Sequence, residues 1–334
     1  MNDGNPFSLS IIVPAYNASS TLSRCLDSVF KQAGPEIDVL VVDDCSSDNT
    51  REIASGYPVR LLEMDKGRGP GAARNRGATD ARAPVLFFID ADVTLGERAL
   101  ARARADIAAP GVDAVIGSYD DDPGAPSTVS QFKNLAHHYF HQHSDPDATT
   151  FWGACGLIKR ELFLSVGGFS EEINALEDVD LGYRLSARGA CIKLDPELQV
   201  KHLKHWTLAQ LLRTDFGLRA LPWAHLLMKY GYLPRGLNFR RSQQAATLLA
   251  MLLVVFGAAT IFRPAAAVPF VLCIALAAAV NRGLYELFFR KGGLRLLVGG
   301  FLLQQLYYLY SVCGLVVGIA LSRLGKRRFS SVRS

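Results

Sequence analysis

The sequence predicts an α/β protein with a mostly parallel, Rossmann-like sheet, followed by helices that associate with a membrane. Up to residue 202, short apolar runs alternate with helical patterns, a rhythm typical of parallel strands joined by right-handed crossovers. Beyond residue 242 the chain carries long apolar stretches instead. We therefore expect an α/β domain over residues 1–202, amphipathic helices over 203–241 and a transmembrane region over 242–334.

The α/β part begins with strands and helices in alternation. Apolar residues recur on one face of the first helix, and Ser19 or Ser20 is placed to cap it. The second helix follows a turn rich in residues that favour the N-cap. Strands are expected at residues 8–14, 36–42 and 59–62, and helices at 19–31 and 51–54.

Two aspartates follow the next apolar run and are the strongest candidate for a ligand site. The run at residues 85–89 has the length and composition of a strand that is buried on both faces. Asp90 and Asp92 follow it, at the edge where open α/β sheets bind ligands. Residues i and i+2 of an extended segment face the same side, so both carboxylates can address a divalent ion that a diphosphate also holds. The alternative is an Asp-rich turn that caps the next helix.

A glycine-rich loop at residues 66–71 leads into a helix expected at 72–81. It follows the third strand, so it is not a dinucleotide-binding fingerprint, which follows the first strand. Its backbone N–H groups are placed to hold an anion, with Arg68, Arg74 and Arg76 as additional charge. The alternative is a solvated basic turn.

The pattern is weak between residues 117 and 150, where we expect a helix or a lid. His137 and His141 share a helical face there, but no carboxylate or thiol completes a metal site at a fixed spacing. An extended segment is expected at 151–158. A helix follows at 175–188, with carboxylates in its first turn, which the helix dipole alone would favour.

Composition limits the compartment and the partners. The cysteines are scattered without a C-x-x-C pair, which argues against zinc and against a disulfide framework and suits a reducing compartment. The first residues lack the pattern of a signal peptide. The net charge is +5, and basic residues gather near the apolar segments and the tail, so a membrane surface is a better partner than nucleic acid.

Seven motifs together resemble the family 2 inverting glycosyltransferases of the GT-A fold. They occur in family order and cover most of the chain up to residue 202. The resemblance implies a nucleotide-diphosphate sugar as donor, with a UDP-sugar favoured, and Mg²⁺ or Mn²⁺ as cofactor. The motifs are VPAYN (13–17), VVDDCSSDNT (41–50), GPGAARNRG (69–77), FIDADV (88–93), GACGLIKR (153–160), GGF (167–169) and LEDVDLGYRL (176–185).

The resemblance also implies a role for individual residues. Asp178 falls where the family places its general base. Asp92 would bind the metal, Asp90 would approach the ribose and the metal, and His202 would be a further ligand or a structural histidine. With the glycine-rich loop included, nucleotide-sugar binding is expected at Pro14, Tyr16, Asn17, Asp43, Asp44, Arg74 and Asp90. The acceptor side is expected at Gly153, Cys155, Gly156 and Glu177.

The polymer-making branch of the family has Q-x-x-R-W after the base, and this chain departs from that pattern. Here Gln210 to Arg213 is followed by Thr214. We therefore expect one sugar to be transferred per encounter, by a hexosyltransferase-type enzyme.

The second half of the chain is predicted to associate with the membrane. Residues 203–228 mix aromatic and basic side chains, which favours interfacial helices over a soluble helix pair. Apolar stretches follow at 243–262, 265–280 and 294–321. A span needs about 20 residues, so the first qualifies, the second is short and the third is long. Arg263-Pro264 is too brief for anything but a hairpin turn.

The basic residues between the apolar stretches indicate on which side of the membrane each connecting segment lies. With the α/β domain in the cytoplasm and the anchor in the inner or plasma membrane, Arg282, Arg290, Lys291 and Arg295 fall inside, as the positive-inside rule requires. Three spans would place Lys326 to Arg328 outside, against the rule, so the number of crossings stays open.

These expectations describe a membrane-anchored enzyme that moves one sugar from a nucleotide-diphosphate donor to a lipid or lipid-linked acceptor. Three alternatives stay open: a processive polysaccharide synthase, a polyprenyl-phosphate glycosyltransferase and a catalytically silent membrane protein that binds sugar nucleotides.

Overall fold

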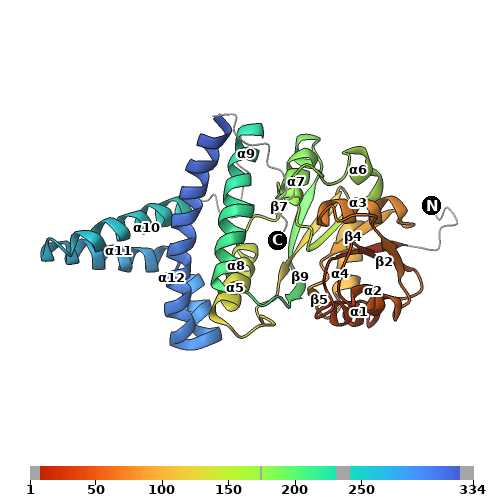
Figure 1. The fold of residues 1–334 in the computed structure, drawn as a ribbon, viewed down its shortest axis with the longest axis horizontal. Helices are drawn as coiled ribbons and strands as arrows, with labels where there is room; N and C mark the ends of the chain where they lie inside the picture. The colour runs from red at the N-terminus through yellow and green to blue at the C-terminus, as the bar shows by residue number, and fades with distance from the viewer. Residues whose placement is uncertain (1–7, 174, 231–240, 324–334) are drawn as a thin grey trace. The chain divides into compact units, whose positions relative to one another are not determined.

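The computed structural model describes residues 8–173, 175–230 and 241–323, which form two compact units (Figure 1). The first unit contains the described residues up to 124 and residues 144–204. The second contains residues 125–143 and the described residues from 205 onward. The segment 125–143 therefore belongs with the C-terminal helices, a division that a single boundary after residue 202 does not anticipate.

A mixed sheet forms the centre of the first unit. Its strands are β1 (Leu9–Ala15), β2 (Ile37–Asp43), β3 (Arg60–Glu63), β4 (Val85–Ile89), β5 (Val93–Leu95), β6 (Ala114–Tyr119), β7 (Asp147–Ala148), β8 (Cys155–Lys159) and β9 (Ile192–His202). They lie in the order β3-β2-β1-β4-β8-β6-β9-β5, with β7 beside β9. The first four in this order are parallel, whereas β8 is antiparallel to both β4 and β6. The prediction of a mostly parallel sheet is wrong for the second half, because the βα repeats end at β4.

Helices cover both faces of this sheet. They are α1 (Leu22–Phe30), α2 (Thr50–Ser55), α3 (Pro70–Asp80), α4 (Ala99–Ala108), α6 (Arg160–Ser165) and α7 (Glu177–Ala187). Successive strand residues point to opposite faces, so Ile11 packs in one core with α1 and α4, and Ile12 packs in another with α3, α6 and α7. Strands β1 and β2 are buried along their whole length, as the apolar runs predict.

The first helix is not capped by a serine. It begins at Leu22, with Thr21 at the N-cap and no side-chain cap hydrogen bond, so the prediction for Ser19 or Ser20 is wrong. The Ser19 N–H donates to Asp48 Oδ2 at 3.1 Å instead. This bond ties the turn after β1 to the loop after β2.

The second unit is helical. Its elements are α5 (Thr128–Gln142), α8 (Leu208–Leu212), the π-helical η1 (Arg213–Ala220), α9 (Leu221–Tyr230), α10 (Arg241–Ala259), the 3₁₀ turn η3 (Pro264–Ala266), α11 (Ala267–Val280) and α12 (Arg282–Arg323). The backbone leaves helical geometry once inside α12, at Gly293.

Within the described residues, Arg241–Ala259 and Arg282–Leu321 are long and apolar enough to cross a membrane, whereas α11 is shorter. The expected three spans thus reduce to two candidates by length. All six cysteines are free in the structure.

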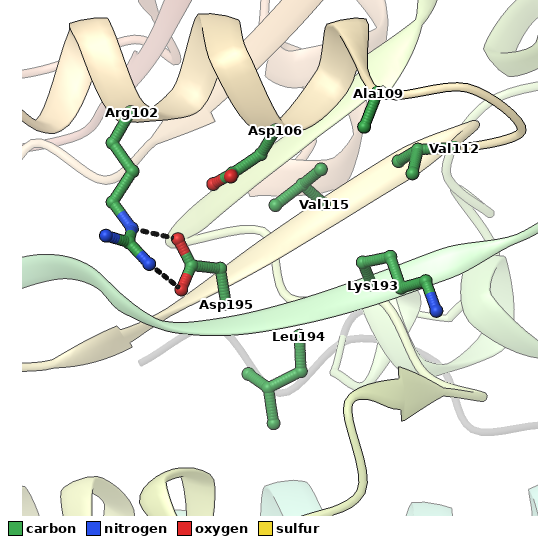
Figure 2. Close-up of a pocket in the computed structure, with 8 residues that line it drawn as sticks. All are labelled: Arg102, Asp106, Ala109, Val112, Val115, Lys193, Leu194 and Asp195. Carbon is green, nitrogen blue, oxygen red and sulfur yellow. Dashed lines mark hydrogen bonds and ion pairs between the residues drawn. The ribbon is translucent and has the colours of Figure 1, made fainter.

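A small cavity of about 290 Å³ lies between α4 and β9 (Figure 2). The Arg102 guanidinium binds the Asp195 carboxylate, and the Asp106 carboxylate lies beside them. Burial and the neighbouring Asp195 carboxylate raise the pKa of Asp106 to about 7. Burial opposes the ionisation of Asp195 as well, but its hydrogen bonds with Arg102 and Asp106 outweigh that effect and lower its pKa.

Replacing Asp106 with asparagine should flatten the pH dependence of the thermal midpoint. A carboxyl whose pKa is raised in the folded state stabilises that state below pH ~4 and loses this contribution as the pH rises to ~7. The midpoint of the wild-type protein should therefore fall between pH ~4 and ~7, and less so in Asp106→Asn. Glu172→Gln, at an exposed position, is the control. Equal slopes in all three proteins would contradict this assignment.

Candidate active site

Asp90 and Asp92 lie directly beyond β4, at the carboxyl end of the parallel strands, as the sequence predicts. The guanidinium of Arg74, from α3, bridges two carboxylates. Its Nη2 lies 2.6 Å from Asp90 Oδ1, and its Nη1 lies 2.8 Å from Glu177 Oε1 at the start of α7. Arg74 therefore ties the loop after β4 to the first turn of α7.

The charges in this bridge depend on one another. Burial opposes the charge of Arg74, but the charges of Asp90 and Glu177 outweigh it and raise the pKa of the guanidinium. Burial and the charge of Asp178 raise the pKa of Glu177 to about 7, against the effect of Arg74. The structure thus gives Arg74 a positioning contact, and its predicted contact with a nucleotide stays a prediction.

His202 lies beside Asp92. Strands β5 and β9 pair Val93 with His202, which places the imidazole Nε2 3.6 Å from Asp92 Oδ2. Burial alone would raise the pKa of Asp92. The contact with His202 and the charge of His202 outweigh burial and lower this pKa.

Two aromatic residues that the sequence analysis did not single out support this pair. The Tyr119 ring stacks on the His202 imidazole, with ring centroids 4.6 Å apart and planes 13° apart. The Trp152 ring meets Tyr119 edge-on at 4.9 Å. Tyr119 ends β6, the parallel neighbour of β9, and no local pattern in the sequence reports that pairing.

Asp92 and His202 suit a divalent metal ion. A carboxylate oxygen and an imidazole nitrogen 3.6 Å apart can both reach one ion, and Mn²⁺ accepts both donor types whereas Mg²⁺ prefers oxygen. Within the described residues, no group of three or more His, Cys, Asp or Glu side chains is arranged to hold a metal. Further ligands would therefore come from a bound diphosphate or from water.

The predicted nucleotide-binding residues after β1 and β2 lie together. Ala15 pairs with Asp43 across the two strands, so Pro14, Tyr16 and Asn17 stand beside Asp43 and Asp44. Tyr16 is 56% exposed. Asn17 adopts a left-handed conformation (φ 48°), which asparagine tolerates, and its Oδ1 accepts from the Ser47 N–H at 2.9 Å.

The glycine-rich loop does not hold an anion through the N–H groups of Arg68 and Gly69. Both donate to the carboxylate of Asp44, each at 2.7 Å, and the Arg68 side chain pairs with Glu171. Arg76 pairs with Asp80 along the surface of α3. The anion-binding prediction is therefore wrong for these two N–H groups, because Asp44 already satisfies them.

The predicted acceptor-side residues divide into two pairs. The Gly153 N–H donates to Asp178 Oδ2 at 3.4 Å, and Glu177 lies on Arg74. A Cβ at Gly153 would lie only 2.9 Å from Arg74 Cζ, so the close approach requires glycine. Cys155 and Gly156 belong to β8, between β4 and β6, and both are buried. The acceptor-side prediction is wrong for the Cys155 side chain, which lies in the core.

Residues 10–167 match the family model described as Glycosyl transferase family 2. The chain therefore contains a family 2 glycosyltransferase domain. Five of the seven motifs lie inside the matched residues, whereas GGF reaches beyond their end and the motif that carries Asp178 follows them.

Curated relatives match part of this chain. Validoxylamine A glucosyltransferase from Streptomyces hygroscopicus subsp. limoneus is 31% identical over 218 residues, which span 54% of this chain and 48% of that protein. Succinoglycan biosynthesis protein ExoO from Rhizobium meliloti is 40% identical over 105 residues, 30% of each protein. The matches thus span about half of the first relative and less of the second.

Solved structures share the fold of this family 2 domain. The mannosyltransferase PcManGT from Pyrobaculum calidifontis, in complex with GDP-Man and Mn²⁺, aligns with a TM-score of 0.55 at 20% identity, over 92% of this chain and 86% of that one. TarS residues 1–349 from S. aureus, in complex with UDP-GlcNAc, align with a TM-score of 0.52 at 17% identity, over 98% and 95%. These likenesses confirm the prediction of a GT-A fold.

Proposed function

We propose that this protein is a membrane-anchored inverting glycosyltransferase that moves one sugar from a nucleotide-diphosphate sugar to a lipid or lipid-linked acceptor. One observation carries the proposal. Arg74 and Asp90 lie within the residues that the family model matches, and Arg74 links Asp90 to Glu177 beyond them. The Gly153 N–H donates to Asp178, so the carboxylates expected to act at the donor and at the acceptor lie at one edge of the sheet.

The donor side would use a divalent ion. Asp92 and His202 would hold Mn²⁺ or Mg²⁺, which neutralises charge on the leaving diphosphate when bound. The Mn²⁺ and GDP-Man bound by the Pyrobaculum mannosyltransferase, and the UDP-GlcNAc bound by TarS, support a sugar nucleotide with a metal. We favour a UDP-sugar as donor.

The acceptor side needs one base. As the new bond forms between the acceptor oxygen and the anomeric carbon, the bond from that carbon to the diphosphate breaks on the opposite face. The acceptor hydroxyl then loses its proton to a carboxylate within hydrogen-bond reach. Asp178 would take this proton, while Glu177, bound to Arg74, would hold the start of α7 in place.

The test is nucleotide release by the purified full-length protein across UDP-, GDP- and dTDP-sugars, with total membrane lipid as acceptor. We expect release that depends on lipid and favours one donor, with the mass of one sugar added to a lipid. Repeated mass increments would indicate a processive synthase. No release with any donor would indicate a silent binding protein.

Replacing Glu177 with glutamine should remove an inflection near pH 7 from the pH profile of kcat/KM. With its pKa raised to about 7, Glu177 is neutral below that pH and charged above it. A second negative charge beside Asp178 favours proton acceptance, so wild-type activity should rise through pH 7. In Glu177→Gln, kcat/KM should lack this rise and stay at the level expected for a neutral side chain at position 177 on both sides of pH 7. A wild-type inflection that persists in the variant would contradict this.

A further inference from the structure

Helices α10 and α11 form a hairpin whose surface is apolar. Only 17% of the most apolar window of α10 is buried, and the buried residues of α11 are Cys273 and Ala277. In Figure 1 this pair extends away from α12, which lies alongside α9. Exposed large apolar side chains occur along both arms and at the turn: Leu248, Met251, Val254, Val255, Ile261, Phe262, Val268, Val271, Leu272, Ile274, Leu276 and Val280.

The two helices of the hairpin are each about long enough to cross a bilayer. Helix α10 has 19 residues, which span about 28 Å at the α-helical rise, against a hydrocarbon thickness of about 30 Å. Helix α11 has 14 residues and is preceded by the 3-residue turn η3, which together reach about 27 Å. The connection carries an exposed arginine, Arg263. An apolar surface of this length with a cation at its tip fits a lipid bilayer better than a protein groove.

The other end of the hairpin is polar. Gln243 Nε2 donates to Asn281 Oδ1 at 3.1 Å, Asn281 Nδ2 donates to the Tyr308 hydroxyl at 3.0 Å, and that hydroxyl donates to Gln243 Oε1 at 2.7 Å. This buried ring joins α10, the end of α11 and α12. The exposed Arg241 and Arg282 begin α10 and α12 at the same end, where they suit anionic lipid headgroups.

Helix α12 is apolar in composition, but one of its faces contacts charged groups. Tyr310 lies near the middle of the apolar stretch 294–321, and its hydroxyl donates to Asp215 Oδ2 at 2.6 Å. Lys133 Nζ lies 2.5 Å from the other oxygen of the same carboxylate, which is 3% exposed. If this stretch crossed the bilayer, the Lys133–Asp215 pair would stand near its centre, where ionised side chains are costly.

We propose that, of the described helices, α10 and α11 alone enter the bilayer, as a hairpin with Arg263 at the far interface, while α12 stays on the near side with α5, η1 and α9. This inference rests on the membrane anchorage proposed above and defines its topology. Two crossings return the chain to its starting side. Lys326 to Arg328 lie outside the described residues, but with two crossings they fall on the cytoplasmic side, so the conflict with the positive-inside rule disappears.

The experiment maps sidedness in intact cells and inside-out vesicles, with the full chain and a C-terminal epitope tag. The cysteines that are not fully buried, Cys45, Cys191 and Cys313, are replaced by serine. Arg263→Cys should then react with a membrane-impermeant maleimide added to intact cells. Leu302→Cys, at an exposed position of α12, should react only in inside-out vesicles. The tag should be cut by protease only in those vesicles.

Each other outcome overturns the topology. Cleavage of the tag in intact cells, with Leu302→Cys shielded in both preparations, would mean that α12 crosses. Reaction of Arg263→Cys only in inside-out vesicles would mean that the hairpin does not cross. The tag reports on sidedness without changing any helix, so the test does not depend on how the cysteine variants fold. Release of the unmodified protein by carbonate washing would instead refute the anchorage itself.

Discussion

Asp92→Ala should abolish sugar transfer, and a chelator should silence the wild-type protein reversibly. Asp92 is the carboxylate that stands beside His202, 3.6 Å away, and no group of three side chains able to hold an ion exists within the described residues. Removal of Asp92 would leave too few ligands, and the charge on the leaving diphosphate would lose a stabilisation of several kcal/mol. The measurement is transfer after treatment with EDTA and titration with Mn²⁺.

Two further variants distinguish a loss of metal binding from a non-specific loss of activity. Glu97→Ala, at an exposed position beyond β5, should keep wild-type activity and metal dependence. His202→Ala should raise the Mn²⁺ concentration needed for half-maximal activity if the imidazole is a ligand, and leave it unchanged if the histidine is structural. Full wild-type activity in excess EDTA would contradict the metal assignment altogether.

The parts of the fold that could be predicted are the segments whose apolar composition indicates that they are buried. Strands β1, β2 and β4 read as apolar runs because both of their faces are covered. Strand β9 is not anticipated because Pro196 and Glu197 interrupt its alternation of buried and partly exposed residues. The antiparallel direction of β8 could not be inferred, since an apolar run carries no sign of its direction.

In the candidate site, too, the features that could be predicted are those that depend on local sequence alone. Asp90 and Asp92 could be placed because they follow a strand directly, and placing them needs no distant residue. The bridge between Arg74 and Glu177 joins residues 103 positions apart, and the contact of Asp44 with the glycine-rich loop crosses 24 and 25 positions. Local patterns do not report such pairs, so the sequence predicts an anion site at a loop in which the Arg68 and Gly69 N–H groups already bind a carboxylate.

Asp178→Asn should lower turnover by about 10²-fold or more while leaving donor binding nearly unchanged, the usual scale for the loss of an acid–base group. The substitution keeps the size of the side chain and an oxygen that can accept the Gly153 N–H, so the start of α7 should be preserved. It removes the ability to accept a proton. The measurements are kcat with saturating acceptor and, separately, the affinity for the nucleotide sugar. Asp180→Asn is a poor control because Asp180 pairs with Arg184, so the exposed Glu172→Gln serves instead.

The same variant distinguishes two classes of acceptor. An acceptor hydroxyl has a pKa far above 7, so its attack needs a carboxylate base, and the loss in Asp178→Asn would indicate a sugar or a lipid alcohol. A lipid phosphate is already ionised near neutral pH and needs no base. If Asp178→Asn turns over at close to the wild-type rate, Asp178 only stabilises the first turn of α7 through the helix dipole. A polyprenyl phosphate would then become the favoured acceptor, and the Arg74 bridge to Asp90 and Glu177 would serve donor binding alone.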